Sequence, residues 1–416
     1  MRTLLTNIVA AAVYVAVCGQ ASAQDISLRL LHTTPVDLYQ ALNEGFLAGH
    51  NTMRFRSDPA QPDYDVLTQN LLRGAIAGDL PDVVFQGYNR ARLTIERGVV
   101  VPLDKFILGD ANLAVEGYPP AALEMCALNG KPYGLPFATS VPIVYYNLDL
   151  VAKAGRDPHA LPSDWNGILA LARDIKAASR DKMAVFFDYA TTGNWTFQAL
   201  LASFGGQMMT ADGGVGFDNE AGQRALSLLA AFRDAGQVDM SRSQAWQTFS
   251  AGGLGILIST SSLLPQFEQQ SAGNFQVGTG AFPMTAPNGR LPAGGNCAMI
   301  MTKDPTKQRA AWEYIRFASG PFGQTIVAMK SGYIPMNTQA VEDPALLGAY
   351  YKEHPNYLTA VKQVPILTRF ESFPGDNSMK LTTVINDHLR TLMLNQAQPH
   401  EALAAMTKDV KALLRK

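Results

Sequence analysis

An alternation of strand and helix patterns near the N-terminus most constrains the fold of this 416-residue chain. Strand-like segments at 26–31, 53–56 and 82–85 are separated by helical patterns at 36–48 and 65–77. Parallel strands need a crossover connection between them, and a helix is the usual one. The order therefore predicts a mostly parallel sheet covered by helices.

Strand-like segments return after long helical stretches in the rest of the chain, and no Pro- or Ser-rich linker separates two halves. This recurrence favours an α/β chain that crosses between two lobes several times. The later strand-like segments are 134–137, 141–146, 185–187, 255–259, 274–282 and 297–301. The later helical patterns are 165–178, 195–204, 220–235, 308–318, 322–329, 345–353, 381–395 and 400–414.

Composition argues against a nucleic-acid or membrane surface bound through a basic face of the protein. The chain has 34 basic and 35 acidic residues, and only 17% of its residues are charged. A net charge of −1 lacks the basic footprint of a nucleic-acid-binding protein or of a polybasic membrane-surface protein. We expect a surface covered mainly by neutral polar residues and no nucleic-acid partner.

Residues 1–23 have the pattern of a secretory signal peptide. Arg2 provides the positive end, an apolar run follows from Leu4 to Val17, and cleavage is expected near Ala23. A lipid anchor at Cys18 is an alternative, but Val17 is larger than the residue that usually precedes a lipidated cysteine. We expect a soluble, exported protein located in the periplasm.

Two cysteines remain beyond the signal segment. Cys126 and Cys297 lie far apart in sequence, and they could pair in an oxidising compartment. Two buried free thiols are the interpretation that the sequence favours.

Catalytic motifs are missing from the sequence. It contains no His-Glu-x-x-His or Cys-x-x-Cys metal pattern, no phosphate-binding loop and no Gly-x-Ser-x-Gly nucleophile turn. We therefore expect no catalytic residues, no metal site, no cofactor and no enzymatic activity. A glycan-processing hydrolase or lyase stays an alternative, since carboxylate pairs such as Asp63 and Asp65 cannot be placed in space from the sequence.

Aromatic and small polar residues gather where predicted strands meet helices. In open α/β sheets, ligands bind beyond the carboxyl ends of the strands. Aromatic faces stack on sugar rings, and hydroxyls and helix N-terminal amides bond to their oxygens. The junctions are His32-Thr33, Tyr64, Gln86-Gly87-Tyr88, Thr139-Ser140, Gly193-Asn194-Trp195, Ser259 to Ser262, Gly294-Gly295-Asn296 and Gly332-Tyr333.

Four stretches carry a resemblance to a known family: GDLPDVVFQGY (78–88), GKPYGLPFATSVPIVYYNLDLVAKAG (130–155), AGGNCAMIM (293–301) and MKSGYIPMNTQA (329–340). They resemble the extracellular solute-binding proteins of ABC importers, family 1, which include maltose-binding and glycerol-3-phosphate-binding proteins. SGYIP and its spacing to YYKEHPNYLTAVKQV (350–364) are most similar to the glycerol-3-phosphate and glycerophosphodiester binders.

The resemblance implies a periplasmic-binding-protein-like α/β fold, with two sheet-and-helix lobes joined by hinge strands. We expect 24–136 and 266–320 to form one lobe, and 137–265 and 321–416 the other. The implied function is to bind a sugar, glycoside or glycerol-phosphate-type solute in the interlobe cleft. The bound receptor, expected to be a monomer, would deliver it to an ABC permease in the inner membrane. A ligand sensor for a membrane signalling protein is the second alternative.

The resemblance also supplies candidate ligand-binding residues, with two departures. Tyr88 stands where the closest subfamily has an acidic residue, and Thr382 where it has a phosphate-binding arginine. Arg369 and Lys380 lie near Thr382 in sequence and could replace that arginine. The predicted ligand-binding set is His32, Tyr64, Tyr88, Ser140, Trp195, Ser261, Gly295, Tyr333 and Arg369.

Overall fold

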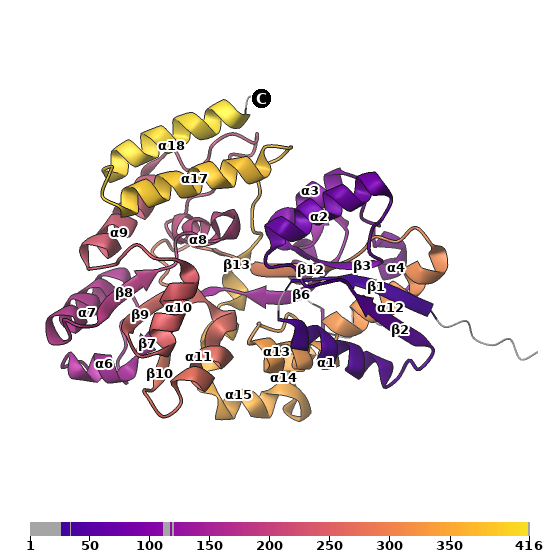
Figure 1. Cartoon of the computed structure of the whole chain (residues 1–416), viewed down its shortest axis with the longest axis horizontal. Coiled ribbons are helices and arrows are strands. Elements are labelled where there is room, and N and C mark those ends of the chain that lie inside the picture. The colour runs from indigo at the N-terminus through magenta and orange to yellow at the C-terminus, as the bar shows by residue number, and fades with distance from the viewer. Residues whose placement is uncertain (1–25, 34, 111–116, 119, 415–416) are drawn as a thin grey trace, which may run out of the picture.

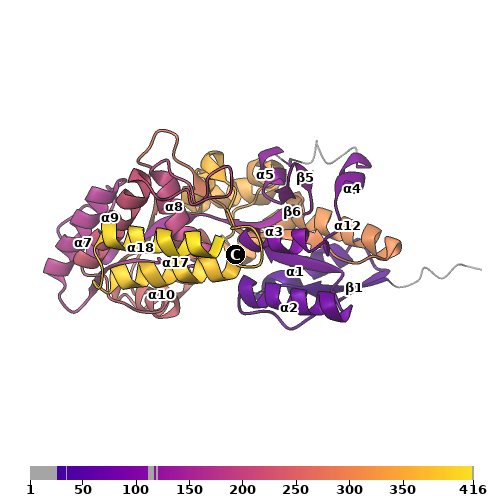
Figure 2. The ribbon, with the colours of Figure 1, turned by 90° about the horizontal axis from the view of Figure 1, so that it is seen from above.

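The computed structural model describes residues 26–33, 35–110, 117–118 and 120–414. Figures 1 and 2 show two bodies side by side, each with a β-sheet covered by helices. This architecture confirms the predicted periplasmic-binding-protein-like α/β fold. The chain passes between the two bodies more than once, because neighbouring strands of one sheet come from distant parts of the sequence.

The first sheet has the strand order β2-β1-β3-β12-β6. β1 pairs in parallel with β2 and β3, while β12 pairs antiparallel with β3 and β6. The parallel part agrees with the strand and helix alternation of the N-terminal sequence. The bounds are β1 Ile26–Leu31, β2 Met53–Ser57, β3 Val83–Gly87, β6 Leu135–Ser140 and β12 Gly294–Ile300.

The second sheet has the strand order β10-β7-β9-β8. β7 is antiparallel to β10 and β9, and β8 is parallel to β9. Only Val141 separates β6 of the first sheet from β7 of the second, so the chain crosses directly between the sheets there. The bounds are β7 Pro142–Asn147, β8 Met183–Phe187, β9 Leu254–Thr260 and β10 Val277–Ala281.

Helices cover both sheets, and their apolar sides form separate buried cores. Around the first sheet lie α1 Val36–Leu47, α2 Tyr64–Ala77, α3 Tyr88–Glu96, α4 Asp104–Leu108, α5 Pro120–Glu124, α12 Pro305–Ser319 and α13 Pro321–Ser331. Around the second lie α6 Leu148–Lys153, α7 Trp165–Ala178, α8 Trp195–Ser203, α9 Glu220–Asp234, α10 Arg242–Ser250, α11 Leu264–Ser271, α16 Pro355–Val361, α17 Ser378–Met393 and α18 Pro399–Leu414. The remaining short elements are β4 Ala127–Leu128, β5 Lys131–Pro132, β11 Leu291–Pro292, β13 Leu367–Thr368, α14 Thr338–Glu342 and α15 Ala349–Glu353.

Local capping explains why the helix that carries Tyr64 begins where it does. The Asp63 carboxylate accepts hydrogen bonds from the backbone N–H groups of Asp65 and Val66 at 2.8 and 2.9 Å. These bonds satisfy donors that a helix start otherwise leaves open. The helix ends at Gly78, whose φ of 71° favours glycine. Tyr64 is therefore held as the first residue of α2, next to the end of β3.

Strand pairing moves several of the expected lobe boundaries. The sequence places 266–320 in the first lobe, yet β10 lies at the edge of the second sheet. Conversely, the sequence places 137–140 and 321–331 in the second lobe, but 137–140 belong to β6 of the first sheet, and α13 packs on α1 and α12. The strand patterns were recognisable, but alternation within a strand carries no information about which sheet it joins.

The predicted signal segment 1–23 lies outside the described residues. Within the part of the chain that is described, no helix is both long enough and apolar enough to cross a membrane. A cleaved leader is therefore still a prediction from the sequence.

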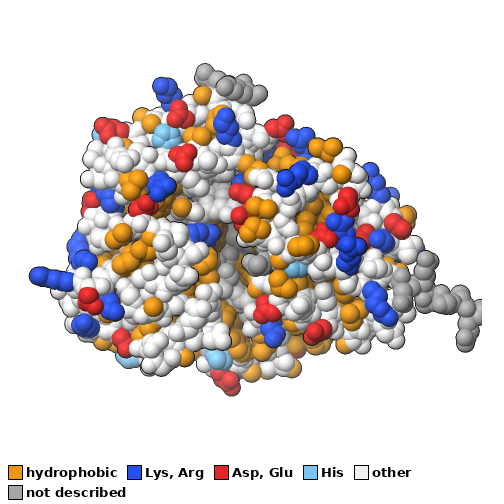
Figure 3. All heavy atoms as spheres, in the orientation of Figure 1, with side chains coloured by type: hydrophobic (Ala, Val, Ile, Leu, Met, Phe, Trp, Pro, Cys, Tyr) orange, Lys and Arg blue, Asp and Glu red, His pale blue; other side chains and the backbone are white. Residues whose placement is uncertain are grey.

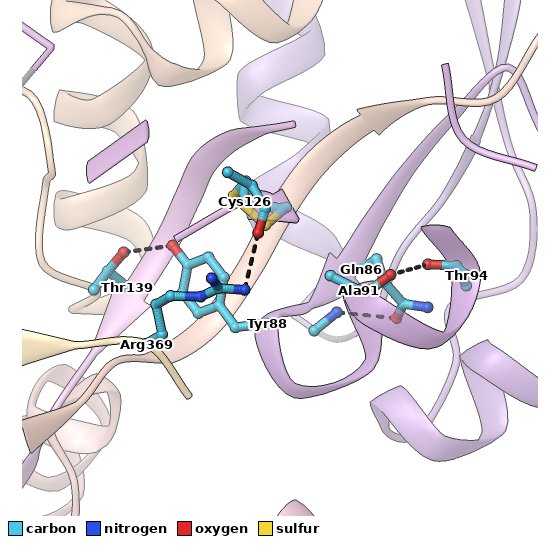
Figure 4. The surroundings of a disulfide bond; sticks show 10 residues. Gln86, Tyr88, Ala91, Thr94, Cys126, Thr139 and Arg369 are labelled. Carbon is cyan, nitrogen blue, oxygen red and sulfur yellow. Dashed lines mark hydrogen bonds between the residues drawn. A yellow bond between two sulfur atoms is a disulfide. The ribbon is translucent and has the colours of Figure 1, made fainter. Parts of the chain in front are cut away.

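Cys126 and Cys297 form a disulfide, so the preferred prediction of two free thiols is wrong. Cys297 lies in β12, and Cys126 lies just before β4, 171 residues earlier in the sequence (Figure 4). Both residues are almost fully buried. Sequence separation could not reveal the pair, because only the insertion of β12 beside β3 and β6 brings the two cysteines together.

We expect loss of this disulfide to lower stability. A bridge across so long a loop removes much conformational entropy from the unfolded chain, so replacing both cysteines by serine should cost about 2–5 kcal/mol of unfolding free energy. Urea denaturation measures the change. Dithiothreitol should lower the midpoint of the natural protein and leave that of the serine variant unchanged. Equal midpoints for the natural protein and the serine variant without dithiothreitol would contradict the expectation.

Candidate functional site

A cleft of about 460 Å³ lies between the two sheets and their helices. Figure 3 shows the hollow between the two halves of the molecule. Residues from both bodies line it. Its aromatic residues are Tyr64, Trp195, Trp246, Tyr333 and Phe370, and its hydroxyl residues include Thr33, Ser140, Thr191, Thr192, Thr260, Ser262 and Ser331. Its charged residues are Asp37, Asp63, Arg242 and Lys330.

The first two residues of β12 bring backbone close to the cleft. A Cβ atom at Gly294 would lie 2.7 Å from Trp195 Cζ2 and 2.8 Å from Ser140 Oγ. At Gly295 the φ angle is 115°, and a Cβ there would lie 1.7 Å from the Ala138 carbonyl oxygen. Glycine is therefore required at both positions, and its absence of a side chain lets Trp195 pack directly against β12.

Tyr64 and Tyr333 both line the cleft wall. The Tyr64 hydroxyl accepts a hydrogen bond of 2.9 Å from Asn296 Nδ2, and its ring packs against Gly87. Burial raises the pKa of both tyrosines above 10.0, so both hydroxyls stay neutral at physiological pH. The hydroxyls of Tyr64 and Tyr333 also interact with each other. Both tyrosines therefore contribute neutral groups to the lining of the cleft.

Trp195 is placed by a tight turn at the start of α8. Gly193 and Asn194 both have left-handed backbone, with φ angles of 66° and 59°. The indole Nε1 donates a hydrogen bond of 2.7 Å to the carbonyl oxygen of Pro292. Because that donor is already used, Trp195 can offer a solute mainly its apolar ring surface.

The first turns of α10 form a charged wall of the cleft. Arg242 Nε donates to Asp188 Oδ2 at 3.1 Å, and the guanidinium carbon lies 4.8 Å from the centre of the Trp246 ring. The Trp246 indole donates to Ser259 Oγ at 3.3 Å, and Ser259 donates to the same Asp188 oxygen at 3.0 Å. Asp188 itself is 1% exposed. Ionic, aromatic and hydrogen-bond contacts thus hold Arg242 in place.

Five of the nine predicted site residues line the cleft together: Tyr64, Ser140, Trp195, Gly295 and Tyr333. They come from α2, β6, α8, β12 and the segment after α13. The family resemblance and the junctions of strands and helices therefore indicated several residues of one cavity. That these residues bind a solute is still a prediction.

His32 and Ser261 adjoin the cleft without lining it. The His32 ring stacks on Tyr39 at 3.8 Å between ring centres, and its Nδ1 hydrogen-bonds to the Thr33 carbonyl oxygen at 2.8 Å. Ser261 is buried, and its Oγ accepts from the Val141 N–H at 3.3 Å. In both cases the neighbouring residue faces the cleft, because the backbone turns at these junctions.

Tyr88 and Arg369 lie at a different cavity, of about 240 Å³. The hydroxyls of Tyr88 and Thr139 share a hydrogen bond of 2.8 Å, and Arg369 Nη2 donates to the Ala127 carbonyl oxygen at 2.9 Å (Figure 4). Phe370 is the residue of this segment that lines both cavities. The expected cation of the cleft is therefore not Arg369. Thr382 is buried in α17 and accepts a hydrogen bond of 3.3 Å from Arg90.

Arg242, Trp246 and Lys330 also line the cleft, and none of them is among the predicted site residues. α10 is absent from the predicted helices, although Ser241 and Gln244 form a capping box that marks its start. The four-residue spacing of Arg242 and Trp246 places both on one face of a helix, and this spacing is the sequence feature that could have indicated them as a pair. Which helix face meets the cleft could not be read from spacing alone.

We expect His32 to make stability depend on pH. Burial lowers its pKa below the usual 6.5, so the unfolded chain binds a proton before the folded chain does. The free energy of unfolding should therefore fall as the pH drops through 6.5. Urea denaturation between pH 7.5 and 5 measures this loss.

The His32→Asn variant should lose less stability than the natural protein over that range, because it removes the buried imidazole. The exposed His400 on α18 supplies a matched His400→Asn control, which should keep the full dependence. A dependence that is the same in all three proteins would contradict the expectation.

A sequence profile of bacterial extracellular solute-binding proteins matches residues 47–359. This range covers most of the chain, and the chain therefore belongs to that family. The family consists of binding proteins.

Individual relatives carry more specific names. The sn-glycerol-3-phosphate-binding periplasmic protein UgpB of Salmonella typhimurium is 23% identical over 392 residues, which cover 87% of this chain and 88% of UgpB. UgpB from Mycobacterium tuberculosis, solved in complex with glycerophosphocholine, superposes with a TM-score of 0.83 at 20% identity over 94% of this chain and 98% of its own. The cyclic alpha-maltosyl-1,6-maltose binding protein from Arthrobacter globiformis gives a TM-score of 0.76 at 21% identity, over 94% and 99%. At these identities the structural likenesses show the shared fold.

Proposed function

We propose that this chain is the receptor of an ABC importer. It binds a sugar, glycoside or glycerol-phosphate-type solute in the cleft and delivers the solute to a membrane permease. The single observation that carries this proposal is that the cleft is lined from both bodies, with Tyr64 on one side and Trp195 and Arg242 on the other. A solute that contacts both sides stabilises a closed arrangement, since only differential affinity shifts such an equilibrium.

The chemistry of the lining supports a polyol or carbohydrate. Aromatic rings suit the apolar faces of sugar rings, and the threonine and serine hydroxyls suit their oxygens. A volume of about 460 Å³ falls within the range of roughly 300–1,000 Å³ that small-molecule sites occupy. The named relatives bind glycerol 3-phosphate, glycerophosphocholine and a cyclic maltosaccharide, so both phosphate-bearing and neutral solutes are candidates.

Two further points of the proposal are where the protein is located and whether it changes its solute chemically. We infer a periplasmic, monomeric receptor that is released from a leader cleaved near Ala23 and that leaves its solute chemically unchanged. Incubation of the pure protein with each solute that binds, followed by product analysis, tests the last point. Product formation would favour the hydrolase or lyase alternative, and loss of solute uptake on gene deletion would favour transport over sensing.

A thermal-shift screen tests the function directly. The panel contains neutral sugars, glycerol phosphates, glycerophosphodiesters and sulfonated glycosides. A solute at 100 times its dissociation constant should stabilise the protein by roughly 2.7 kcal/mol, because it binds the folded chain alone. A panel in which no compound raises the melting temperature would contradict the proposed function.

Substitutions at β12 and α8 should then weaken binding of any compound that passes the screen. Trp195→Ala removes a ring surface from the cleft and should raise the dissociation constant at least tenfold, about 1.4 kcal/mol. Gly294→Ala should also weaken binding, because its Cβ displaces Trp195. Gly49→Ala is the matched control, since its Cβ would meet only the Phe46 carbonyl oxygen, at 4.0 Å. Unchanged calorimetric affinity in Trp195→Ala would remove Trp195 from the binding site.

A further inference from the structure

We infer that Arg242 is an anion-binding residue of the cleft, and that the solute therefore carries an oxyanion on its polyol or sugar part. Phosphate, sulfonate and carboxylate groups share the required chemistry. The inference rests on the proposed function and narrows its substrate class.

Arg242 is a cation held in place by Asp188, and it has further N–H donors that Asp188 does not use. Its Nε is used by Asp188, while its Nη1 and Nη2 have no hydrogen-bond partner among the residues that the structure describes. The side chain is 32% exposed and lines the cleft. A guanidinium that is already oriented loses less freedom when its remaining N–H groups bind an oxyanion in fork geometry.

Trp246 and Asp188 act as positioning residues for this cation. The Arg242 guanidinium lies over the Trp246 ring, so that ring face is covered and cannot stack on a sugar. Asp188 is buried, and its Oδ2 accepts from both Arg242 and Ser259. A buried carboxylate needs its partner charge, which ties the position of Arg242 to the end of β8.

The other charges of the cleft suit an anion at Arg242. The Asp63 carboxylate is already engaged by two backbone N–H groups at the start of α2. Asp37 lies in the first turn of α1, in the body of the first sheet and not on the wall formed by α10. Lys330 lies in the last turn of α13, which packs on α1. Each body thus contributes one cation to the cleft, Arg242 from α10 and Lys330 from α13, and one anionic solute could contact both.

The alternative role for Arg242 is purely structural, as the counter-ion of Asp188. The two roles differ in what a substitution does. A structural arginine affects charged and neutral solutes alike, through stability. An anion-binding arginine affects the charged member of a matched pair of solutes and leaves the neutral member unchanged.

The experiment compares matched pairs by calorimetry: glycerol 3-phosphate with glycerol, glucose 6-phosphate with glucose, and glucuronate with glucose. The natural protein should bind the charged member of at least one pair at least tenfold more tightly. Which pair responds distinguishes phosphate from carboxylate. In Arg242→Gln this preference should disappear, and in Arg242→Lys it should be reduced but retained, because the charge stays while the fork is lost.

Arg242→Gln leaves Asp188 without its counter-ion and could fail to fold. The double variant Asp188→Asn/Arg242→Gln removes both charges and keeps a neutral hydrogen-bonding pair, so it should fold and lack the preference. Arg224→Gln is the matched control, because the Arg224 guanidinium lies 4.6 Å from the centre of the Phe204 ring outside the cleft lining. It should keep the full preference.

The outcomes separate the inference from the proposed function. Neutral solutes that bind as tightly as charged ones, or a preference that survives in the double variant, would overturn the anion-binding role while the receptor function stands. If neither these pairs nor the wider screen yields any binding, the proposed function fails, and the inference fails with it.

Discussion

The antiparallel insertion of β12 between β3 and β6 is the interaction on which the rest of the structure depends. This strand lies more than 150 residues after β6 in sequence, yet its backbone pairs with two strands of the N-terminal sheet. Asn296 lies opposite Gly87 of β3, and Gly294 lies opposite Ser140 of β6. Strand pairing satisfies backbone groups that burial would otherwise leave open. The pairing commits the chain to cross between the two sheets, and it brings Cys297 to Cys126.

The cleft follows from that insertion. β12 enters the sheet through Gly294 and Gly295, and a side chain at either position would collide with Trp195, Ser140 or the backbone of β6. At these two glycines the strand therefore has only backbone where the two bodies meet. Trp195 from α8 packs on it, Asn296 orients Tyr64, and Ser140 ends β6 at the same point. Residues from distant parts of the sequence thus line one cavity.

Burial then decides which polar groups remain available to a solute. The Trp195 indole, the Asp63 carboxylate and the Tyr88 hydroxyl are already hydrogen-bonded within the protein, and Asp188 is inaccessible. Arg242 differs, because one of its nitrogens pairs with a buried carboxylate while the others have no partner among the described residues. The near-neutral composition of the chain is thus compatible with a local cation in the cleft.

The sequence alone determined most of the strands, many of the helices, the α/β class and the family resemblance, because strand and helix periodicity are local properties. The family resemblance, together with positions at junctions of strands and helices, also indicated Tyr64, Ser140, Trp195, Gly295 and Tyr333, which line the cleft. Only the tertiary structure decided that β10 belongs to the second sheet, that the cysteines pair, and that Arg242 rather than Arg369 faces the cleft. These outcomes depend on strand order and on the rotation of packed helices, which are set by contacts between residues far apart in the chain.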